Sequence, residues 1–229
     1  MLRHVQVLII DGHPGRERLT TALLDAYRAA LPPTATVTTI AVRDLTFDPT
    51  LHAGYGAEQP WEPDVARVAR ELDACDHVCF GFPLWWGAEP APLLALLERV
   101  LMPGFAFRYR TTSVFWEKRL RGRSADLIVT MDSPPLFLRL VYGDPIGRRW
   151  ACAGARFCRH RPDSHPALRT DATRRCQAKC DGVVRARRSN GAIDPRDSWQ
   201  NEESCPRRPR CLRRSGRRTT IVIPIAKKR

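Results

Sequence analysis

The sequence predicts an α/β fold in which helices cover both faces of a doubly wound parallel sheet. Over the first 150 residues, short runs rich in Val, Ile and Leu alternate with longer stretches whose apolar residues recur at helical spacing. The runs have the continuous apolar character of parallel strands that are buried on both faces. The connections between the strands are therefore expected to be right-handed crossovers.

The first strand and the first helix have well-marked ends. Residues 4–10 form a short β-branched run that stops at Asp11-Gly12, which predicts a buried strand. In residues 17–31, leucines and a tyrosine recur at helical spacing, and Pro32-Pro33 ends the pattern. This second segment is therefore predicted to be a helix.

The following segment repeats the order of strand and helix. Residues 36–42 predict a second strand, and residues 63–72 predict a second helix. Between them, residues 44–61 carry an Asp-Pro pair and two glycines, which are turn signals and predict a long loop.

The remaining strands of the domain lie in its second half. Residues 77–81 and 125–131 are apolar runs and predict the third and fourth strands. Residues 91–101 carry leucines at helical spacing and predict a third helix between them.

The chain changes character near Trp150. Residues 1–150 hold 17 Lys+Arg and 17 Asp+Glu and carry no net charge, whereas residues 151–229 hold 21 and 7, a net charge of +14. The second segment shows no sustained periodicity and too little apolar clustering to offset the entropy cost of ordering it. We expect residues 1–150 to form the domain and residues 151–229 to form a disordered basic tail.

The tail supplies no recognisable fifth strand or closing helix for the sheet. Thr219 to Ile225 is its one candidate strand, and Pro224 weakens that interpretation because proline cannot donate to a strand ladder. We therefore expect the sheet to lack a proper fifth strand. The abundance of Arg, Pro, Ala, Cys and Ser suggests the hypothesis that the tail is an out-of-frame translation of a GC-rich gene.

Two functional interpretations of the tail are disfavoured. Its cysteines include Cys176-x3-Cys180 and Cys205-x5-Cys211, which lack the C-x2-C spacing of structural zinc sites, so we expect no metal. Its arginine pairs could contact the phosphates of a nucleic acid, but no interleaved aromatic residues support base stacking.

The location of the protein is predicted from its apolar segments. The longest candidate, residues 5–10, is too short for a membrane span and lacks the flanks of a signal peptide. We expect a cytoplasmic protein with reduced thiols, in which Cys75 and Cys79 are small core residues.

Polar and glycine residues follow the first predicted strand, from Asp11 to Thr21. A loop at this place in an α/β sheet brings backbone N–H groups and a helix N-terminus to a phosphate. The loop is neither a Walker A motif nor a G-x-G-x-x-G motif, which disfavours a nucleotide triphosphate site and a standard dinucleotide fold. An ordinary polar turn remains the alternative.

The most informative segment is Gly81 to Tyr109, which reads GFPLWWGAEPAPLLALLERVLMPGFAFRY. The segment predicts a strand, then a loop with two adjacent tryptophans and a glycine, then a helix. This pattern is typical of a site that binds a flat aromatic ligand at the carboxyl edge of a parallel sheet. Trp85 and Trp86 cannot both face the same core, so at least one should be exposed or covered by a ligand.

These segments resemble the flavodoxin-like NAD(P)H:quinone oxidoreductase family over residues 4 to about 150. The matching segments are, in order, Gly12-His13-Pro14, Asp44-Leu45, Phe47 to Leu51, Ala74 to His77, Phe82 to Gly87, Pro90-Ala91, Glu98 to Val100, Pro103 to Tyr109, Thr130 to Pro135 and Leu140 to Pro145. The resemblance implies a flavodoxin-like fold. It also implies a flavin, FMN or FAD, that takes hydride from NAD(P)H at N5 and passes it to a quinone-like acceptor.

The resemblance implies three groups of flavin-binding residues. The residues bordering the flavin phosphate would be His13, Arg18, Leu19 and Thr20. The residues packing along the ring would be Pro83, Leu84, Trp85 and Trp86. The residues lining its other side would be Thr130, Met131, Asp132 and Ser133. Catalysis would rest on the flavin itself. The Tyr/His pair that assists proton relay in the family has no match in this sequence, and Tyr142, a candidate for this role, lies with Asp144 near the place where the pair would stand. The protein would be a homodimer.

Two other functions are weighed against the enzyme. A non-enzymatic flavodoxin-like electron carrier or regulatory subunit is the first, and it is disfavoured because its flavin would be shielded from a quinone. Non-specific nucleic-acid binding through the tail is the second.

Overall fold

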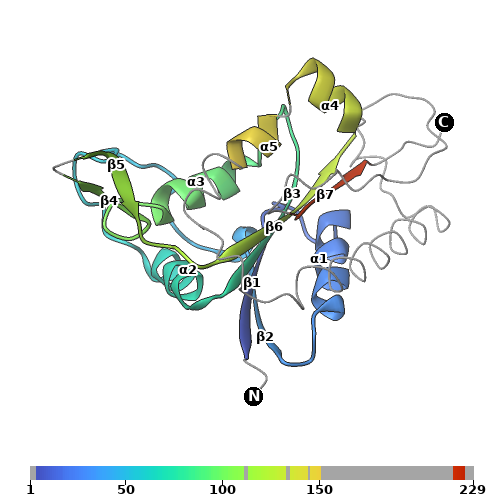
Figure 1. Cartoon of the computed structure of the whole chain (residues 1–229), viewed down its shortest axis with the longest axis horizontal. Coiled ribbons are helices and arrows are strands. Elements are labelled where there is room, and N and C mark those ends of the chain that lie inside the picture. The colour runs from blue at the N-terminus through green and yellow to red at the C-terminus, as the bar shows by residue number, and fades with distance from the viewer. Residues whose placement is uncertain (1–3, 111–112, 133–134, 144, 151–218, 225–229) are drawn as a thin grey trace.

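A computed structural model describes residues 4–110, 113–132, 135–143, 145–150 and 219–224 (Figure 1). Its centre is a parallel sheet of five strands in the order β2-β1-β3-β6-β7. The strands are β1 (Val5–Asp11), β2 (Ala35–Ala41), β3 (His77–Pro83), β6 (Ser124–Met131) and β7 (Thr219–Pro224). The α/β class and the four strands of the first 150 residues are confirmed.

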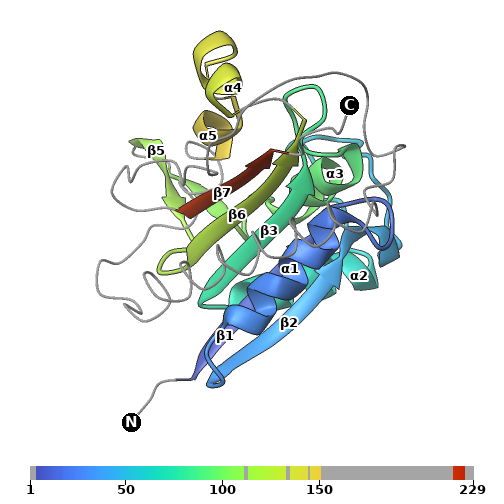
Figure 2. The same ribbon diagram turned by 90° about the vertical axis from the view of Figure 1, so that its right-hand side faces the viewer.

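Helices cover both faces of the sheet (Figure 2). The helix α1 (Leu19–Ala30) packs on one face, and α2 (Pro63–Ala74) and α3 (Ala91–Val100) pack on the other. A short 3-10 turn, η1 (Val42–Asp44), follows β2. Two short helices that the sequence did not predict, α4 (Pro135–Val141) and α5 (Pro145–Arg149), follow β6.

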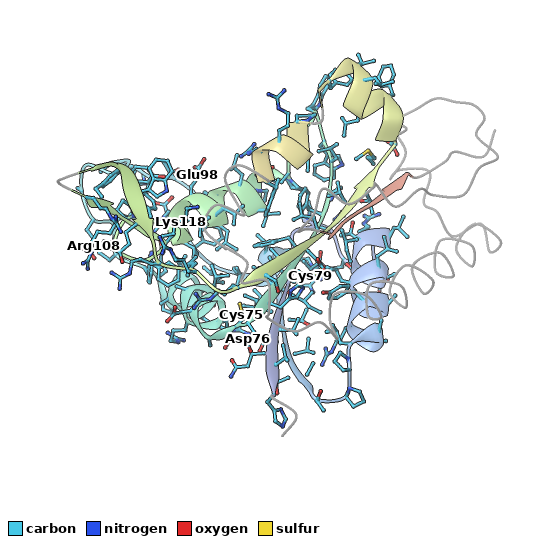
Figure 3. All side chains as sticks on the ribbon, viewed as in Figure 1. Cys75, Asp76, Cys79, Glu98, Arg108 and Lys118 are labelled. Carbon is cyan, nitrogen blue, oxygen red and sulfur yellow. The ribbon has the colours of Figure 1, made fainter. Side chains whose placement is uncertain are left out.

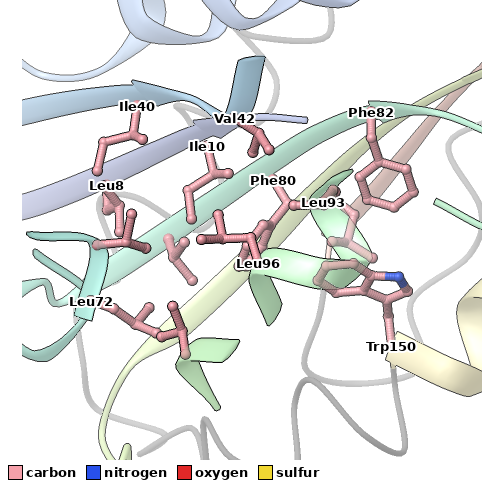
Figure 4. Packing of buried hydrophobic residues seen from close by; sticks show 14 of the residues in the cluster. Leu8, Ile10, Ile40, Val42, Leu72, Phe80, Phe82, Leu93, Leu96 and Trp150 are labelled. Carbon is pink, nitrogen blue, oxygen red and sulfur yellow. The ribbon is translucent and has the colours of Figure 1, made fainter. Parts of the chain in front are cut away.

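Alternation along the strands divides the core in two, because successive strand residues face opposite sides of a sheet. On β1, Val7 and Ile9 belong to the cluster under α1, whereas Leu8 and Ile10 belong to the larger cluster under α2 and α3 (Figure 4). Both clusters are buried, so the prediction of strands covered on both faces is confirmed for β1 and β3, whereas the edge strand β2 buries only Ile40 fully. Gly81 of β3 allows the close approach of α1, since a Cβ there would lie 2.7 Å from the side chain of Leu24.

Helix α1 begins two residues later than predicted. Glu17, the predicted start, has a φ of +56°, which lies in the left-handed region and cannot belong to an α-helix. The other predicted elements agree with the observed ones to within two residues.

An antiparallel hairpin, β4 (Phe107–Arg110) and β5 (Ser113–Lys118), was not predicted by the sequence. It projects from the side of the molecule that carries α2 and α3, and Arg108 and Lys118 lie on its two strands (Figure 3). The missed signal was an alternation of aromatic and basic residues in Phe107–Arg110, followed after two threonines by a short run of β-branched and aromatic residues.

The expectation that the sheet lacks a proper fifth strand was wrong. Backbone pairing joins β7 to β6 in parallel, from Asp126 opposite Thr219 to Met131 opposite Pro224. Five β-branched residues precede Pro224 and suit a strand, and proline is tolerated at the end of an edge strand. The other predictions for the tail concern residues 151–218 and 225–229, which lie outside the described residues.

Within the described residues, Cys75 and Cys79 are small buried residues of the core, as predicted (Figure 3). None of the helices in this part of the chain is both long enough and apolar enough to cross a membrane.

Candidate ligand site at the carboxyl edge of the sheet

The loop between β1 and α1 is held by one buried carboxylate. Asp11, at the end of β1, accepts hydrogen bonds from the backbone N–H of His13 (3.0 Å), the Thr21 hydroxyl (2.8 Å) and Arg43 Nη1 (2.7 Å). Arg43 also donates to the backbone carbonyl of His13 at 3.2 Å. These bonds satisfy the buried charge and fix the path of the loop, so Asp11 and Arg43 are supports of the site that the sequence did not reveal.

His13 and Gly15 form the turn of this loop. The backbone N–H of Gly15 donates to His13 Nδ1 at 2.8 Å, so in the neutral imidazole the proton lies on Nε2. A side chain at position 15 would crowd the turn, because its Cβ would lie 2.8 Å from Arg18 Nε and 3.3 Å from His13 Cε1. The loop therefore brings the His13 ring and the Arg18 side chain close together.

Helix α1 starts in a way that suits an anion. Its N-cap, Arg18, makes no side-chain capping bond, and its first turn contains no acidic residue. The first backbone N–H groups of any helix lack helical partners and carry the positive end of the dipole. They are therefore available to a phosphate group at this end of the sheet.

Two of the predicted phosphate residues turn their side chains elsewhere. Thr20 is buried, and its hydroxyl lies 3.2 Å from the Thr130 hydroxyl on β6. Leu19 is partly buried against the cluster under α1. Both residues can therefore offer a phosphate their backbone N–H groups rather than their side chains.

The two tryptophans form a tight turn after β3. Trp85 and Ala88 exchange backbone hydrogen bonds of 3.0 Å in both directions, and the two residues between them have positive φ, +52° for Trp86 and +77° for Gly87. This is the pattern of a type I′ turn. The Trp85 side chain is 48% exposed and that of Trp86 is fully exposed, so both indoles are open to a ligand, as expected.

The turn is anchored to β6 and lies beside the first loop. The backbone N–H of Leu84 donates to the carbonyl of Thr130 at 2.8 Å, and Pro83 is buried at the end of β3. The Trp85 ring meets the His13 ring edge-on, with 5.8 Å between centroids. The loop between β1 and α1 and the exposed indoles therefore occupy the same edge of the sheet.

The residues predicted to line the other side of the flavin ring, Thr130 to Ser133, differ in their exposure. Thr130 and Met131 are buried, so their side chains contribute to the core, whereas Asp132 is exposed beyond the end of β6. Ser133 lies outside the described residues. Tyr142 is exposed after α4 and packs edge-on against Phe137, with 5.6 Å between ring centroids.

A buried carboxylate that was not predicted follows the tryptophan turn. The Glu89 side chain is 1% exposed, and its Oε1 lies 3.0 Å from Nη2 of Arg149 at the end of α5. Its other oxygen, Oε2, has no hydrogen-bond partner among the described residues. An acidic residue before a helix is ordinarily solvated, so only the packing of α5 reveals this one.

The long loop between β2 and α2 is held by a second buried ion pair. Arg99 of α3 is 1% exposed and donates to both carboxylate oxygens of Glu62, at 3.0 and 2.8 Å, and to the carbonyls of Asp48 (2.6 Å) and Pro60 (3.0 Å). Desolvation is the largest single effect on Glu62 and raises its pKa. The hydrogen bonds from Arg99 and from the backbone N–H groups of Glu62 and Asp48, with the positive charge of Arg99, together outweigh it and leave this pKa below its usual value.

Asp48, in the same loop, also has a lowered pKa. The backbone N–H of Thr50 donates to its carboxylate at 2.8 Å, and this is the largest cause. The His52 ring, 2.8 Å from the other oxygen, adds to the effect.

Comparison with known proteins identifies the fold family. The sequence profile of a family described as "Flavodoxin-like fold" matches residues 5–141. The chain belongs to this family.

Curated relatives match only parts of this flavodoxin-like chain. A 120-residue stretch is 32% identical to "FMN-dependent NADH:quinone oxidoreductase 2" of Bradyrhizobium diazoefficiens, covering 47% of this chain and 57% of the relative. A 49-residue stretch is 47% identical to "NAD(P)H dehydrogenase [quinone] 1" of Rattus norvegicus, covering 21% of this chain and 18% of the relative. The chain thus spans well under two thirds of either relative.

Solved structures share the fold at low sequence identity. "NAD(P)H:quinone oxidoreductase from Methanothermobacter marburgensis" is 19% identical with a TM-score of 0.59, covering 78% of this chain and 99% of that one. An "FMN-dependent NADH-azoreductase" of Bacillus anthracis in complex with FMN is 16% identical with a TM-score of 0.52, covering 81% and 99%. These likenesses concern the fold alone.

Proposed function

We propose that this protein is an FMN-dependent oxidoreductase that transfers hydride from NAD(P)H to a quinone or a related acceptor. The observation that carries the proposal is the contact between the His13 and Trp85 rings, which places an uncapped helix terminus beside two exposed indoles. A phosphate-bearing planar ring system needs both features on one edge of a sheet. The names of the curated relatives support the same reaction.

FMN fits the residues that this edge provides. The backbone N–H groups at the start of α1, with Arg18 and the Nε2 proton of His13, would hold its phosphate. Trp85 and Trp86 would pack along its ring, and the backbone of Thr130 to Asp132 would border it. FMN is favoured over FAD because the Bradyrhizobium relative and the Bacillus anthracis structure are both named for FMN.

When bound, FMN supplies a ring that accepts a hydride and passes it on. The chain itself would orient that ring and leave one side of it open to the two substrates. The open indole of Trp86 offers a stacking surface to a flat acceptor. Tyr142 remains a candidate for proton relay.

The direct test is a titration of the purified full-length chain with FMN, followed by NAD(P)H oxidation in the presence of a soluble quinone. Stoichiometric binding with turnover would support the proposal. Binding without turnover would favour an electron carrier or a regulatory subunit. Failure to bind FMN would refute the proposed function.

We also propose that the protein is a homodimer. Several apolar side chains on and after α4 are exposed without a covering element among the described residues: Phe137, Leu140, Val141 and Tyr142. Such clusters usually mark interaction surfaces. Light scattering should give twice the mass of 26.0 kDa, and a monomer at micromolar concentration would refute the dimer.

A further inference from the structure

We propose that Glu89 and Arg149 form a positioning pair that holds the tryptophan turn, Trp85 to Ala88, in the shape that receives a planar ring. The inference rests on the proposed function for the identity of that ring. It assigns a role to α5, which follows the part of the chain matched by the family.

The turn needs support because its conformation is unfavourable. Trp86 has a φ of +52°, in the left-handed region that non-glycine residues avoid. Its side chain is fully exposed, so no packing of its own indole compensates. Such a conformation persists only where the surrounding structure imposes it.

Helix α5 supplies that support at three places. A Cβ on Gly87 would lie 3.9 Å from Cγ of Pro145, so the first residue of α5 lies against the tip of the turn. Arg149, at the end of α5, pairs with Glu89 directly after the turn. Next to it, the Trp150 ring stacks on Phe82 of β3, with 5.2 Å between centroids and 23° between planes.

Of these three contacts, the ion pair between Glu89 and Arg149 is the one whose loss should disturb the turn most. Glu89 is buried, and the ion pair with Arg149 is the one contact of its carboxylate with a charged group among the described residues, while Oε2 has no hydrogen-bond partner there. Without Arg149, the buried carboxylate would have no charged partner, which strongly disfavours its position. It could reach water only by moving the chain that follows Ala88, and the turn would move with it.

The pair is therefore expected to control the turn more than it controls global stability. The guanidinium of Arg149 is partly exposed, with 43% of its side-chain surface accessible, and contributes little as a surface charge. Its effect passes through Glu89 to the residues that would meet the ring. We thus assign both residues a positioning role rather than a catalytic one.

The test uses fluorine NMR of the full-length chain labelled with 5-fluorotryptophan at its six tryptophans. Trp85→Phe and Trp86→Phe assign the two resonances of the turn. Arg149→Met, Arg149→Lys, Glu89→Gln and the double variant Glu89→Gln with Arg149→Met are then compared with the parent, with and without FMN. The matched control is Arg123→Met, which breaks the ion pair between Arg123 and Asp73, away from the turn.

We expect Arg149→Met to shift or broaden the resonances of Trp85 and Trp86 before any ligand is added, and to raise the Kd for FMN about tenfold. Arg149→Lys should restore most of the affinity. The double variant should bind FMN better than Arg149→Met alone, because an unpaired amide tolerates burial better than an unpaired carboxylate. Arg123→Met should leave both the resonances and the Kd within twofold of the parent.

Unchanged turn resonances in Arg149→Met would overturn the proposal, as would shifted resonances with an unchanged Kd. If the parent binds no FMN, the proposed function fails. The resonances of the free protein then still decide whether the pair positions the turn.

Discussion

The buried guanidinium of Arg99 offers a sharp test of how the long loop after β2 is held. In Arg99→Met, the aliphatic part of the side chain is kept while four hydrogen bonds are lost, two to Glu62 and one each to the carbonyls of Asp48 and Pro60. Removing one partner of a buried ion pair costs about 3–5 kcal/mol. Glu62 keeps 31% of its side-chain surface in water, so we expect a value at the low end, about 3 kcal/mol.

The assay is urea unfolding of the full-length chain at several pH values. Because the pKa of Glu62 is lowered in the folded state, its contribution is present above its ordinary pKa of 4.5 and is lost as the pH falls through the lower folded value. Arg99→Met should therefore be less stable at neutral pH and should lose part of this acid dependence. A loss below about 1 kcal/mol, with the acid dependence unchanged, would refute the reasoning.

Three further predictions concern other parts of the molecule. Trp86→Gly should leave the melting temperature unchanged or slightly raised, because glycine accepts positive φ. Titration with FMN should show an affinity about fivefold weaker than that of the parent, which corresponds to about 1 kcal/mol of lost stacking. Equal affinity would show that Trp86 does not belong to the site. Tyr27→Phe should destabilise the fold by about 1–3 kcal/mol in urea, since the Tyr27 hydroxyl lies 2.8 Å from His77 Nε2 and donates to Asp126 Oδ2 at 3.1 Å in a buried network; a neutral result would mean that water replaces it. Truncation after Trp150 removes β7 and exposes the edge of β6, so calorimetry should show a lower melting temperature and light scattering more aggregation than for the whole chain; equal behaviour would show that β7 contributes nothing.

The sequence predicted most of the sheet because its central strands are buried on both faces and strong turn residues separate the elements. Pro32-Pro33 and Asp11-Gly12 leave little freedom in where the first elements end. The hairpin β4–β5 was missed because its residues pack on side chains from the distant loop, as Tyr55 does against the Phe107 ring at 5.9 Å. The alternation within Phe107–Arg110 is too short to predict a hairpin without these contacts.

Part of the candidate site could likewise be predicted from the sequence, and part of it could not. The exposure of Trp85 and Trp86 was predicted, because two adjacent indoles cannot enter the same core. The inward direction of the Thr20 and Thr130 side chains was not predicted, because the 3.2 Å contact between their hydroxyl oxygens joins residues that lie 110 positions apart in the chain. The burial of Glu89 depends on α5, which has no periodic pattern long enough to reveal it.

The place of β7 in the chain has a consequence for synthesis on the ribosome. Its partner β6 ends at Met131, and the first residue of β7 is Thr219, so 87 residues must be translated between the two strands. At about 5–20 residues per second, the nascent sheet waits roughly 4–17 s with the backbone of β6 unpaired on one side. During this interval the open edge can be captured by another chain, so the yield of native protein should depend on translation speed and on chaperones that shield nascent strands.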